Sequence, residues 1–364
     1  MIKVFFDHQC YWEKYGGVSR YFTEILKTDF EDAEYELALK YSNNEYLNEL
    51  KIDYRHAFNN LIIPKKHYLI SAVNTPNTIK AVKKSTADIV HLTHYNPYLF
   101  KYTKDKIVIS TIHDLNFFAI PQYFSKNKNL LKNWQIKCAE KSDFLITISE
   151  NSKKDLIQYL NIDEQKIKVI YHGVSDSFKK DSSPKIIKNP YILFVGRRCG
   201  YKNFNTVLNA FANIKNKDLF LVCTGLSFSR KENDMINELG VTDRLINISA
   251  SENELINLYS HALFFVYPSL YEGFGLSLIE AMGCECPVLC SDTSCFPEIA
   301  EDAALYFNPY SIDDCIEKMN LLIDNELLRD SLIQKGLIQK QKFSWDVSRQ
   351  QHFELYKNIK DMIN

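Results

Sequence analysis

The chain is organised around one stretch, Pro268-Ser269-Leu270-Tyr271-Glu272-Gly273-Phe274-Gly275-Leu276-Ser277-Leu278-Ile279-Glu280-Ala281-Met282-Gly283. The apolar run 262–267 before it predicts a buried strand, and the glycines predict a turn into a short helix that ends at Gly283. Such a turn leaves the backbone amides of 273–276 unpaired at a helix N-terminus, where phosphate or sugar oxygens bind. The stretch therefore predicts an anion or polyol site between a strand and a helix.

Two carboxylates, Glu272 and Glu280, flank this turn, one before the helix and the other about two turns into it. Their acceptor oxygens suit the hydroxyls of a sugar or a ribose. A plainer interpretation makes Glu272 a partner of the helix dipole and Glu280 a solvated helix residue. The preceding buried strand favours the ligand-binding interpretation, because such sites lie at the carboxyl ends of strands.

The composition describes an ordinary globular protein, with 46% hydrophobic and 24% charged residues. A length of 364 residues predicts two domains. Since 44 Lys and Arg balance 45 Asp and Glu, the net charge of -1 gives no general field for attracting nucleic acid. The N-terminus does not read as a signal peptide, and no apolar run approaches the ~18 residues of a spanning helix, so we expect a cytoplasmic protein.

Nine cysteines without a secretion signal indicate reduced thiols. Four of them are close enough in sequence to suggest a metal site: Cys284, Cys286, Cys290 and Cys295. No paired Cys-x-x-Cys is present, so we favour buried small apolar residues over zinc ligands.

Short apolar runs alternate with helical stretches in both halves of the chain, as in parallel sheets covered on both faces. Segment 29–88 interrupts this pattern, being polar and weakly periodic, and we interpret it as a variable part of the first domain. The polar, proline-bearing segment 177–185 predicts a linker. We therefore expect an α/β protein with two doubly wound Rossmann-like domains, 1–178 and 190–343, followed by an amphipathic helix over 344–364.

Two features of the first domain are candidates for a site. Gly16 and Gly17 stand between the first strand and a helix that Ser19 could cap, where bare backbone can approach a phosphate, although a tight turn explains them equally well. His113 follows the expected strand 107–111, at the ligand-binding edge of such a sheet. Its imidazole can bond a sugar hydroxyl or stabilise a departing charge, and the plainer alternative is a histidine satisfied within its own loop.

Three cations, Arg197, Arg198 and Lys202, lie in the glycine-bearing loop after the expected strand 191–195. A guanidinium fork and an ammonium point charge together suit a diphosphate. The chain lacks the Gly-x-Gly-x-x-Gly fingerprint of nicotinamide dehydrogenases after either first strand. It also lacks an Asp-x-Asp pair that would hold a metal for a sugar transferase, so the pattern predicts a metal-free diphosphate site.

With these motifs, the chain resembles the large group 4 family of retaining glycosyltransferases, which have two Rossmann-like domains facing across a cleft (GT-B). Within that family it resembles the mannosyltransferase-B-like bacterial enzymes. Glu272 and Glu280 match the family's Glu-x7-Glu motif, and 195–204 matches its phosphate-binding loop. The family's Gly-Gly-Val-x-Arg-Tyr and His-Asp-Leu are matched at 16–21 and 113–115.

The resemblance implies a donor site in the second domain. Glu272 would contact the sugar near the reacting carbon, and Glu280 would bind the ribose hydroxyls. Four residues would offer backbone amides beside Glu272: Gly273, Phe274, Gly275 and Leu276.

The diphosphate would be held by Lys202 and one arginine. The subgroup spacing favours Arg198, whereas the broader family has its arginine at the position of Arg197, so both remain candidates. From the first domain, His113 would bond the donor sugar and the pair Gly16-Gly17 would border the phosphates and the acceptor. Four residues are thus expected to serve catalysis: His113, Glu272, Lys202 and Arg198.

The resemblance implies retaining transfer of a hexose from a nucleoside-diphosphate sugar to a glycan or lipid-linked glycan hydroxyl, in surface polysaccharide biosynthesis. GDP-mannose is the first expectation, with UDP- and dTDP-hexoses as alternatives. No metal or other cofactor is expected, and the C-terminal helix would cross back to the first domain. Peripheral contact with the inner face of the membrane is a further expectation. The competing functions are a nucleotide-sugar epimerase of similar fold and a non-catalytic nucleotide-sugar-binding protein.

Overall fold

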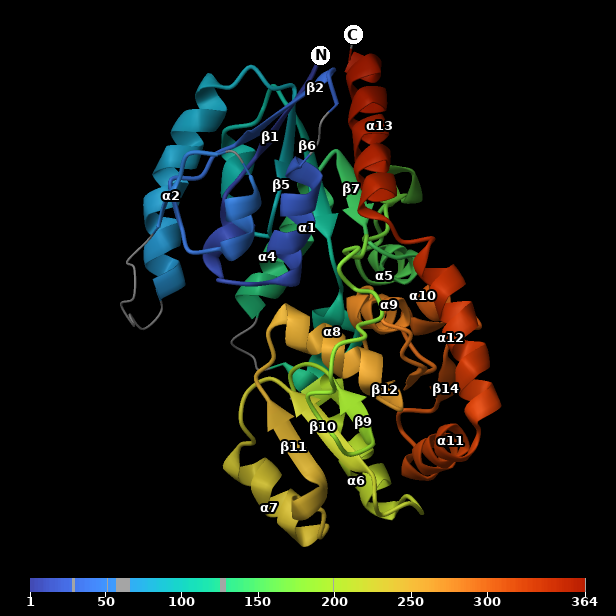
Figure 1. The fold of residues 1–364 in the computed structure, drawn as a ribbon. Helices are drawn as coiled ribbons and strands as arrows, with labels where there is room; N and C mark the ends of the chain where they lie inside the picture. Colours follow the sequence, from blue (N-terminus) through green and yellow to red (C-terminus); the bar gives the residue numbers. More distant parts are fainter. Residues whose placement is uncertain (28–29, 51, 57–65, 125–128, 199, 364) are drawn as a thin grey trace. The chain divides into compact units, whose positions relative to one another are not determined.

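The computed structural model describes the whole chain except residues 28–29, 51, 57–65, 125–128, 199 and 364, and the side chains of 66–68 and 363. The described residues form two compact units, each with its own six-stranded sheet (Figure 1). Unit 1 consists of Met1–Phe118, Phe124–His172 and Trp345–Asn364, and unit 2 consists of Ala119–Tyr123 and Gly173–Ser344. Two Rossmann-like units confirm the α/β fold class that the sequence predicts.

The sheet of unit 1 is parallel throughout, with the strand order β2-β1-β5-β6-β7-β8. Its strands are β1 (Ile2–Phe6), β2 (Ala33–Leu37), β5 (Ile89–Leu92), β6 (Ile107–Ile112), β7 (Phe144–Thr147) and β8 (Ile167–Val169), and β3 (Tyr41–Ser42) and β4 (Arg55–His56) form a separate pair. The central strands are nearly continuously apolar because both faces of the sheet are buried.

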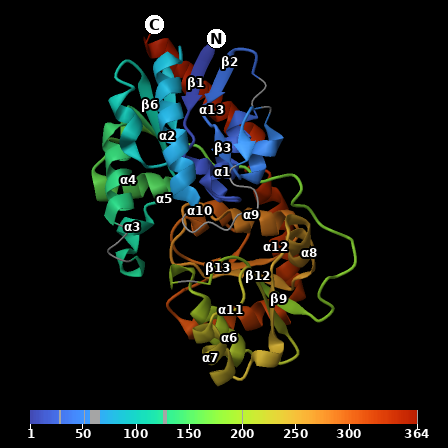
Figure 2. The same cartoon turned by 90° about the vertical axis from the view of Figure 1, so that its left-hand side faces the viewer.

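The helices of unit 1 come from both ends of the chain. They are α1 (Gly17–Leu26), α2 (Lys66–Lys84), α4 (Asn129–Lys141), α5 (Glu150–Leu160) and α13 (Trp345–Ile363), and the short α3 (Asn116–Ala119) lies where the chain passes into unit 2. The last helix, α13, packs against α1 and β1 (Figures 1 and 2). An ion pair between Arg349 and the buried carboxylate of Glu24, 3.2 Å apart, fixes α13 to α1.

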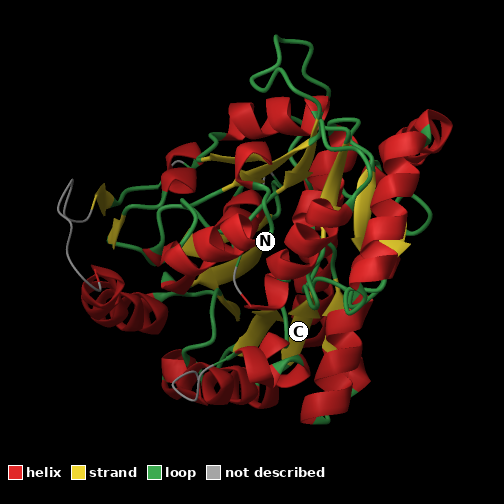
Figure 3. Cartoon of the chain, turned by 90° about the horizontal axis from the view of Figure 1, so that it is seen from below, coloured by secondary structure: helices red, strands yellow, loops and turns green. Residues whose placement is uncertain are grey.

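Unit 2 has the strand order β11-β10-β9-β12-β13-β14, again all parallel. Its strands are β9 (Tyr191–Phe194), β10 (Phe220–Thr224), β11 (Leu245–Ile248), β12 (Phe264–Tyr267), β13 (Val288–Ser291) and β14 (Leu305–Phe307). Its helices are α6 (Phe204–Asn213), α7 (Arg230–Glu238), α8 (Glu252–His261), α9 (Leu276–Gly283), α10 (Phe296–Ala300), α11 (Ile312–Asp324) and α12 (Glu326–Lys340). Figure 3 distinguishes helices from strands by colour. The strand order reverses between β9 and β12, which defines the topological switch point of this unit.

The sequence interpretation assigned no elements to segment 29–88, which contains helix α2 and strands β2, β3 and β4. Among its described side chains, helix α2 buries one residue per turn, and two of these four are polar: Ile70, Asn74, Thr78 and Val82. Those polar side chains have structural partners, since Asn74 Oδ1 accepts from the backbone N–H of Lys40 and of Tyr41, at 3.0 Å each. Strand β2 was missed because it is an edge strand that carries glutamates at alternate positions.

The start of α1 also differs from the expectation. The helix begins at Gly17 with Gly16 as its N-cap, so Ser19 lies inside the first turn and does not cap it. The Ser19 hydroxyl instead donates to the carbonyl of Gly16 over 3.0 Å.

The expected linker 177–185 packs entirely with unit 2, and the chain leaves unit 1 earlier, between His172 and Gly173. Asn257 of α8 holds the segment, because its amide donates to Asp181 and accepts from the N–H of Ile186, at 2.7 and 3.1 Å.

Candidate functional site

Two loops of unit 2 meet at its switch point. Loop 195–203 follows β9 and loop 268–275 follows β12, and the two strands are neighbours in the sheet. The backbone N–H of Leu270 donates to the carbonyl of Tyr201 over 2.8 Å, which ties the loops together. Ligands of doubly wound sheets bind at such a point, outside the carboxyl ends of the strands.

The structure brings Lys202 and Glu272 together at this point, with Nζ 2.5 Å from Oε1. Their side chains are only 21% and 14% exposed, so the pair is partly shielded from solvent. Ser294 fixes the backbone of Glu272, since its hydroxyl donates to the Glu272 carbonyl over 2.7 Å and accepts from the Glu272 N–H over 3.1 Å. The Lys202 ammonium also lies 5.8 Å from the centre of the Tyr267 ring.

The glycine turn leads into α9 later than expected. Gly275 is the N-cap, in a left-handed conformation with φ 85°, and a Cβ there would lie 3.1 Å from the Phe296 ring. Gly273, Phe274 and Gly275 are buried, and Leu276 is the first helical residue. The amides without an intrahelical acceptor are therefore those that begin at Leu276, so the backbone donors of the helix N-terminus lie there.

Glu280 lies about one turn into α9, not two, because the helix starts at Leu276. Its side chain is half-buried, and Oε2 accepts a hydrogen bond from the hydroxyl of Tyr259 over 3.4 Å. Burial, reinforced by the charge of Glu280, raises the pKa of the Tyr259 phenol well above its ordinary value. Tyr259 is thus a neutral donor that orients the carboxylate.

Arg198, the arginine that the subgroup spacing favours, has its guanidinium buried against other residues of unit 2. Its Nε donates to Glu232 of α7 over 2.8 Å, and its side chain is 5% exposed. Its remaining donors reach the Thr224 and Leu226 carbonyls and Asn247 Oδ1. The guanidinium also stacks on the Phe228 ring, 4.6 Å from its centre. Arg198 therefore fastens the loop to β10, β11 and α7.

Arg197, its neighbour, is exposed, and no ion pair of this side chain occurs within the described part of the chain. Of the two arginines, it is the one whose guanidinium is available to a ligand. Residue 199, between this arginine pair and Lys202, lies outside the described residues.

In unit 1, Gly16 and Gly17 form the start of α1. Gly17 is exposed, a Cβ there would meet nothing within 4 Å, and neither residue has a left-handed φ. The fold of unit 1 therefore does not require glycine at Gly17, and close approach of a ligand to the backbone is a sufficient reason for one.

His113 follows β6 and is 9% exposed. Burial, together with the neighbouring His94, lowers the pKa of its imidazole to about 3, so the ring is neutral at physiological pH. The buried Nε2 has no hydrogen-bond partner among the described residues, whereas the backbone N–H donates to the Tyr95 hydroxyl over 3.1 Å. A neutral ring with an unused nitrogen can donate to or accept from a sugar hydroxyl.

Comparison with known families identifies the chain. Residues 175–360 match the model of "Glycosyl transferases group 1", and residues 15–178 match that of "Glycosyltransferase Family 4". The chain belongs to the group 1 glycosyltransferases. This confirms the family that the sequence motifs resemble.

Named relatives of this glycosyltransferase include two O-antigen enzymes. The O-antigen chain mannosyltransferase B of Escherichia coli is 25% identical over 280 residues, which cover 72% of this chain and 74% of that protein. The O-antigen chain mannosyltransferase RfbU of Salmonella typhimurium strain LT2 is 34% identical over 210 residues, covering 55% and 56%. The second match thus spans little more than half of each chain.

Solved structures establish the GT-B fold of the glycosyltransferase. Sucrose-phosphate synthase from Thermosynechococcus elongatus is 19% identical with a TM-score of 0.78, and each chain is covered completely. The Anabaena protein HepE, solved in complex with UDP and glucose, is 17% identical with a TM-score of 0.77, covering 98% of this chain and 100% of that one.

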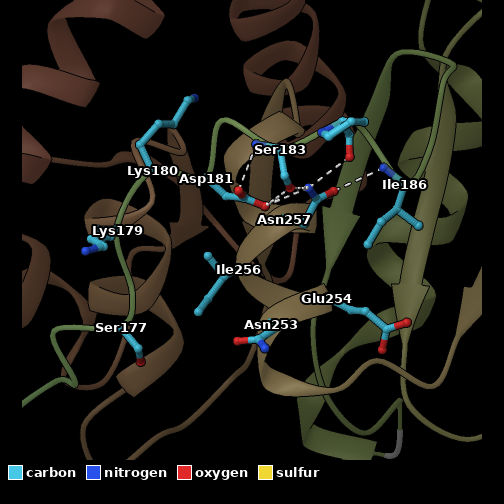
Figure 4. Close-up of a pocket in the computed structure, with 11 residues that line it drawn as sticks. Ser177, Lys179, Lys180, Asp181, Ser183, Ile186, Asn253, Glu254, Ile256 and Asn257 are labelled. Atoms are coloured by element: carbon cyan, nitrogen blue, oxygen red, sulfur yellow. Dashed lines mark hydrogen bonds between the residues drawn. The ribbon is translucent and has the colours of Figure 1, made fainter.

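A surface hollow of about 540 Å³ in the glycosyltransferase lies between segment 177–186 and α8 (Figure 4). It contains none of the candidate residues. The amide of Asn257 in its wall donates to Asp181, Ser183 and the Pro184 carbonyl, so these polar groups hold the segment in place.

The clustered cysteines of the glycosyltransferase are buried, with at most 2% exposure: Cys284, Cys286, Cys290 and Cys295. Burial raises the pKa of the Cys284 thiol to about 12, which keeps it protonated. Within the described ranges, no group of three or more His, Cys, Asp or Glu side chains is arranged to hold a metal. A search of the same ranges finds no helix with the length and apolarity needed to cross a membrane.

Sequence reasoning missed Ser294 and Glu232, which hold Glu272 and Arg198 in place. Both lie far along the chain from their partners, so no local spacing connects them. One available signal was the polar stretch 291–294, which follows a strand at the same edge of the sheet as the glycine turn.

Proposed function

We propose that this glycosyltransferase moves a hexose, with mannose as the first candidate, from a nucleoside-diphosphate sugar to a hydroxyl of a glycan or lipid-linked glycan. The two O-antigen mannosyltransferase relatives support both the sugar and a role in surface polysaccharide biosynthesis. UDP in the HepE complex supports a nucleoside-diphosphate donor, and GDP-, UDP- and dTDP-linked hexoses are the candidates.

The observation that carries the proposal is the Lys202–Glu272 pair at the switch point of unit 2, with 2.5 Å between its charged atoms. In the free protein each side chain orients the other. An entering diphosphate would take Lys202 as its partner, and Glu272 would then be free to accept hydrogen bonds from the sugar hydroxyls. The pair therefore couples phosphate binding to sugar binding.

Charge neutralisation at the leaving diphosphate would come from the protein. Lys202 and the exposed Arg197 supply the cations, and the N-terminus of α9 supplies backbone donors. Preorganised charges of this kind stabilise charge that develops on a leaving group. Glu272 serves positioning and electrostatics, and Glu280 serves the ribose.

Retention of configuration is part of the proposal. The acceptor hydroxyl would attack from the face that the diphosphate leaves, and a phosphate oxygen would take its proton. His113, held neutral, would bond a hydroxyl of the sugar without adding charge.

Binding of the donor tests the proposal first. Titration calorimetry with GDP, UDP, dTDP and their hexose derivatives should give one clearly preferred nucleotide, and that nucleotide should raise the melting temperature. The absence of binding by every nucleotide would contradict the proposal.

Transfer is tested with the preferred donor and a panel of saccharide and lipid-linked acceptors. The anomeric proton of the product, followed by NMR from the first minutes, should show the same configuration as the donor. An inverted product would contradict the retaining mechanism, and a donor epimer formed without acceptor would identify an epimerase.

A further inference from the structure

Buried histidines and tyrosines of unit 1 form a hydrogen-bond chain that begins and ends on α13. Tyr356 Oη lies 2.7 Å from His91 Nδ1, and His91 Nε2 lies 2.7 Å from Thr111 Oγ1. Thr111 Oγ1 is 3.4 Å from Tyr21 Oη, which is 2.6 Å from His352 Nε2. All of these side chains are buried: Tyr21, His91, Thr111, His352 and Tyr356.

The direction of the bond to Tyr21 follows from the chemistry at His352. His352 Nδ1 lies 2.7 Å from the carbonyl of Ser348, which can only accept, so Nδ1 carries the proton. Burial lowers the pKa of His352 to about 4, so the ring is neutral and Nε2 is an acceptor. The hydroxyl of Tyr21 therefore donates to His352.

One assignment of donors and acceptors gives each remaining hydroxyl a partner. Thr111 donates to the oxygen of Tyr21 and accepts from His91 Nε2–H, and His91 Nδ1 accepts from Tyr356. His91 and His352 thus use both ring nitrogens within the chain of bonds.

His113 lies against this chain of bonds but does not use its Nε2 in it. Its ring meets the Tyr21 ring edge-on, with centroids 5.1 Å apart, and it is tilted against the His172 ring at 5.9 Å. The Tyr21 ring is held at its far end by the hydroxyl bond to His352. The orientation of His113 consequently depends on a residue of α13.

We infer that His352 and Tyr21 are positioning residues that hold the imidazole of His113 for the donor sugar. The inference rests on the proposed function for the identity of that ligand, while the positioning itself is a property of unit 1. The C-terminal helix thereby has a role in the reaction through the bond of His352 to Tyr21.

Three variants of the full chain separate positioning from packing. Tyr21→Phe removes only the hydroxyl. His352→Gln keeps an acceptor where Nε2 stands, whereas His352→Asn keeps a donor to Ser348 and loses the acceptor. Both variants carry a carboxamide, so they match in chemistry. Gln places it where Nε2 stands, and Asn places it where Nδ1 stands.

We expect Tyr21→Phe and His352→Asn to lower kcat about tenfold, the usual size of one lost hydrogen bond, with KM for the donor within about twofold. His352→Gln should retain kcat within about twofold of the wild type. Nucleoside-diphosphate affinity should be unchanged in all three. Equal kcat values for the Gln and Asn variants would overturn the inference.

An NMR experiment tests the inference independently of activity. The ring resonances of His113 should shift in Tyr21→Phe and His352→Asn but not in His352→Gln, and unchanged resonances in all three would overturn the inference even if transfer is never detected. In the wild type, the ring ¹⁵N shifts of His352 should show a proton on Nδ1. A proton on Nε2 would overturn it without any variant having to fold. If the wild type transfers no sugar but gives the expected NMR result, the proposed function is rejected instead.

Discussion

The two units share one fold but differ in what they bury. Unit 1 buries ionisable and polar-aromatic side chains, among them Asp7, Glu24 and five histidines with at most 9% exposure: His8, His91, His113, His172 and His352. The described core of unit 2 contains a continuous apolar cluster around β9, β10 and α6, and its Lys202–Glu272 pair lies where its strands end. A parallel sheet covered on both faces thus accommodates a polar interior in unit 1, where hydrogen bonds such as those of His91 and His352 offset the cost of burial.

The largest expected effect is acid unfolding of unit 1 before unit 2. The pKa of His8, of His94 and of His352 is lowered to about 4, mainly by burial, and the pKa of His91 and of His172 is well below its ordinary value. The free energy of unfolding that depends on these neutral histidines is fully present above pH 6.5. It is lost as the pH falls towards 4, at about 1.4 kcal/mol per pH unit for each histidine. Asp7 acts in the opposite sense, since burial raises its pKa.

The chain contains its own probes for this prediction. All three tryptophans, Trp12, Trp134 and Trp345, belong to unit 1. Most of the described cysteines are buried in unit 2: Cys223, Cys284, Cys286, Cys290, Cys295 and Cys315. Tryptophan fluorescence should change at a higher pH than the reaction of these cysteines with a dipyridyl disulfide, followed by mass spectrometry. Coincident transitions would remove the contrast between the units.

Next in size is the loss of activity in Lys202→Ala. We expect kcat to fall about 100-fold or more, close to 3 kcal/mol, because leaving-group charge would lose its main cation. Stability should also fall, by about 1–3 kcal/mol, because the partly buried carboxylate of Glu272 loses its partner. Lys179→Ala, which removes an exposed lysine of the same unit, is the control. A loss of less than about threefold, ~0.7 kcal/mol, would make the leaving-group role untenable.

The two adjacent arginines should separate stability from binding. Arg198→Ala leaves the Glu232 carboxylate without its buried partner, and the free energy of unfolding of unit 2 should fall by about 3 kcal/mol. Arg197→Ala should leave the free energy of unfolding unchanged and weaken nucleoside-diphosphate binding about tenfold. Denaturant unfolding and calorimetry on both variants measure this, and the reverse result would restore Arg198 as the phosphate ligand.

The smallest expected effect belongs to Gly17→Ala. An added Cβ meets no atom within 4 Å, and alanine favours a helix, so the free energy of unfolding should not decrease. If a ligand approaches this backbone, kcat/KM should fall about tenfold through steric exclusion. Chemical denaturation and steady-state kinetics give the two numbers, and unchanged kinetics would reduce Gly16-Gly17 to a simple turn.

Sequence patterns predicted the parts of the fold whose chemistry is local. The apolar runs of the buried strands indicated both sheets, and the glycine turn with Glu272 and Glu280 indicated the family to which the chain belongs. Helix α2 was missed because Asn74 and Thr78 occupy buried positions and so conceal the apolar period. Their burial is favourable only because partners distant in sequence bond them.

Long-range partners also limited the prediction of the site. Two adjacent arginines are equivalent in the sequence, yet Glu232, Thr224, Leu226 and Asn247 take the donors of Arg198. Nothing in the local pattern indicates that these residues converge. The start of α9 is another case, since φ 85° at Gly275 places it after the second glycine.

Unit 1 is assembled from both ends of the chain, and this determines the order in which the protein can fold. Unit 2 ends at Ser344, so its residues are all synthesised before α13, whereas unit 1 lacks His352 and Tyr356 until the last helix is made. During synthesis the C-terminal half can complete its core first, and in the N-terminal half Tyr21 and His91 must wait for their partners on α13. The domain that is made first is therefore the one completed last.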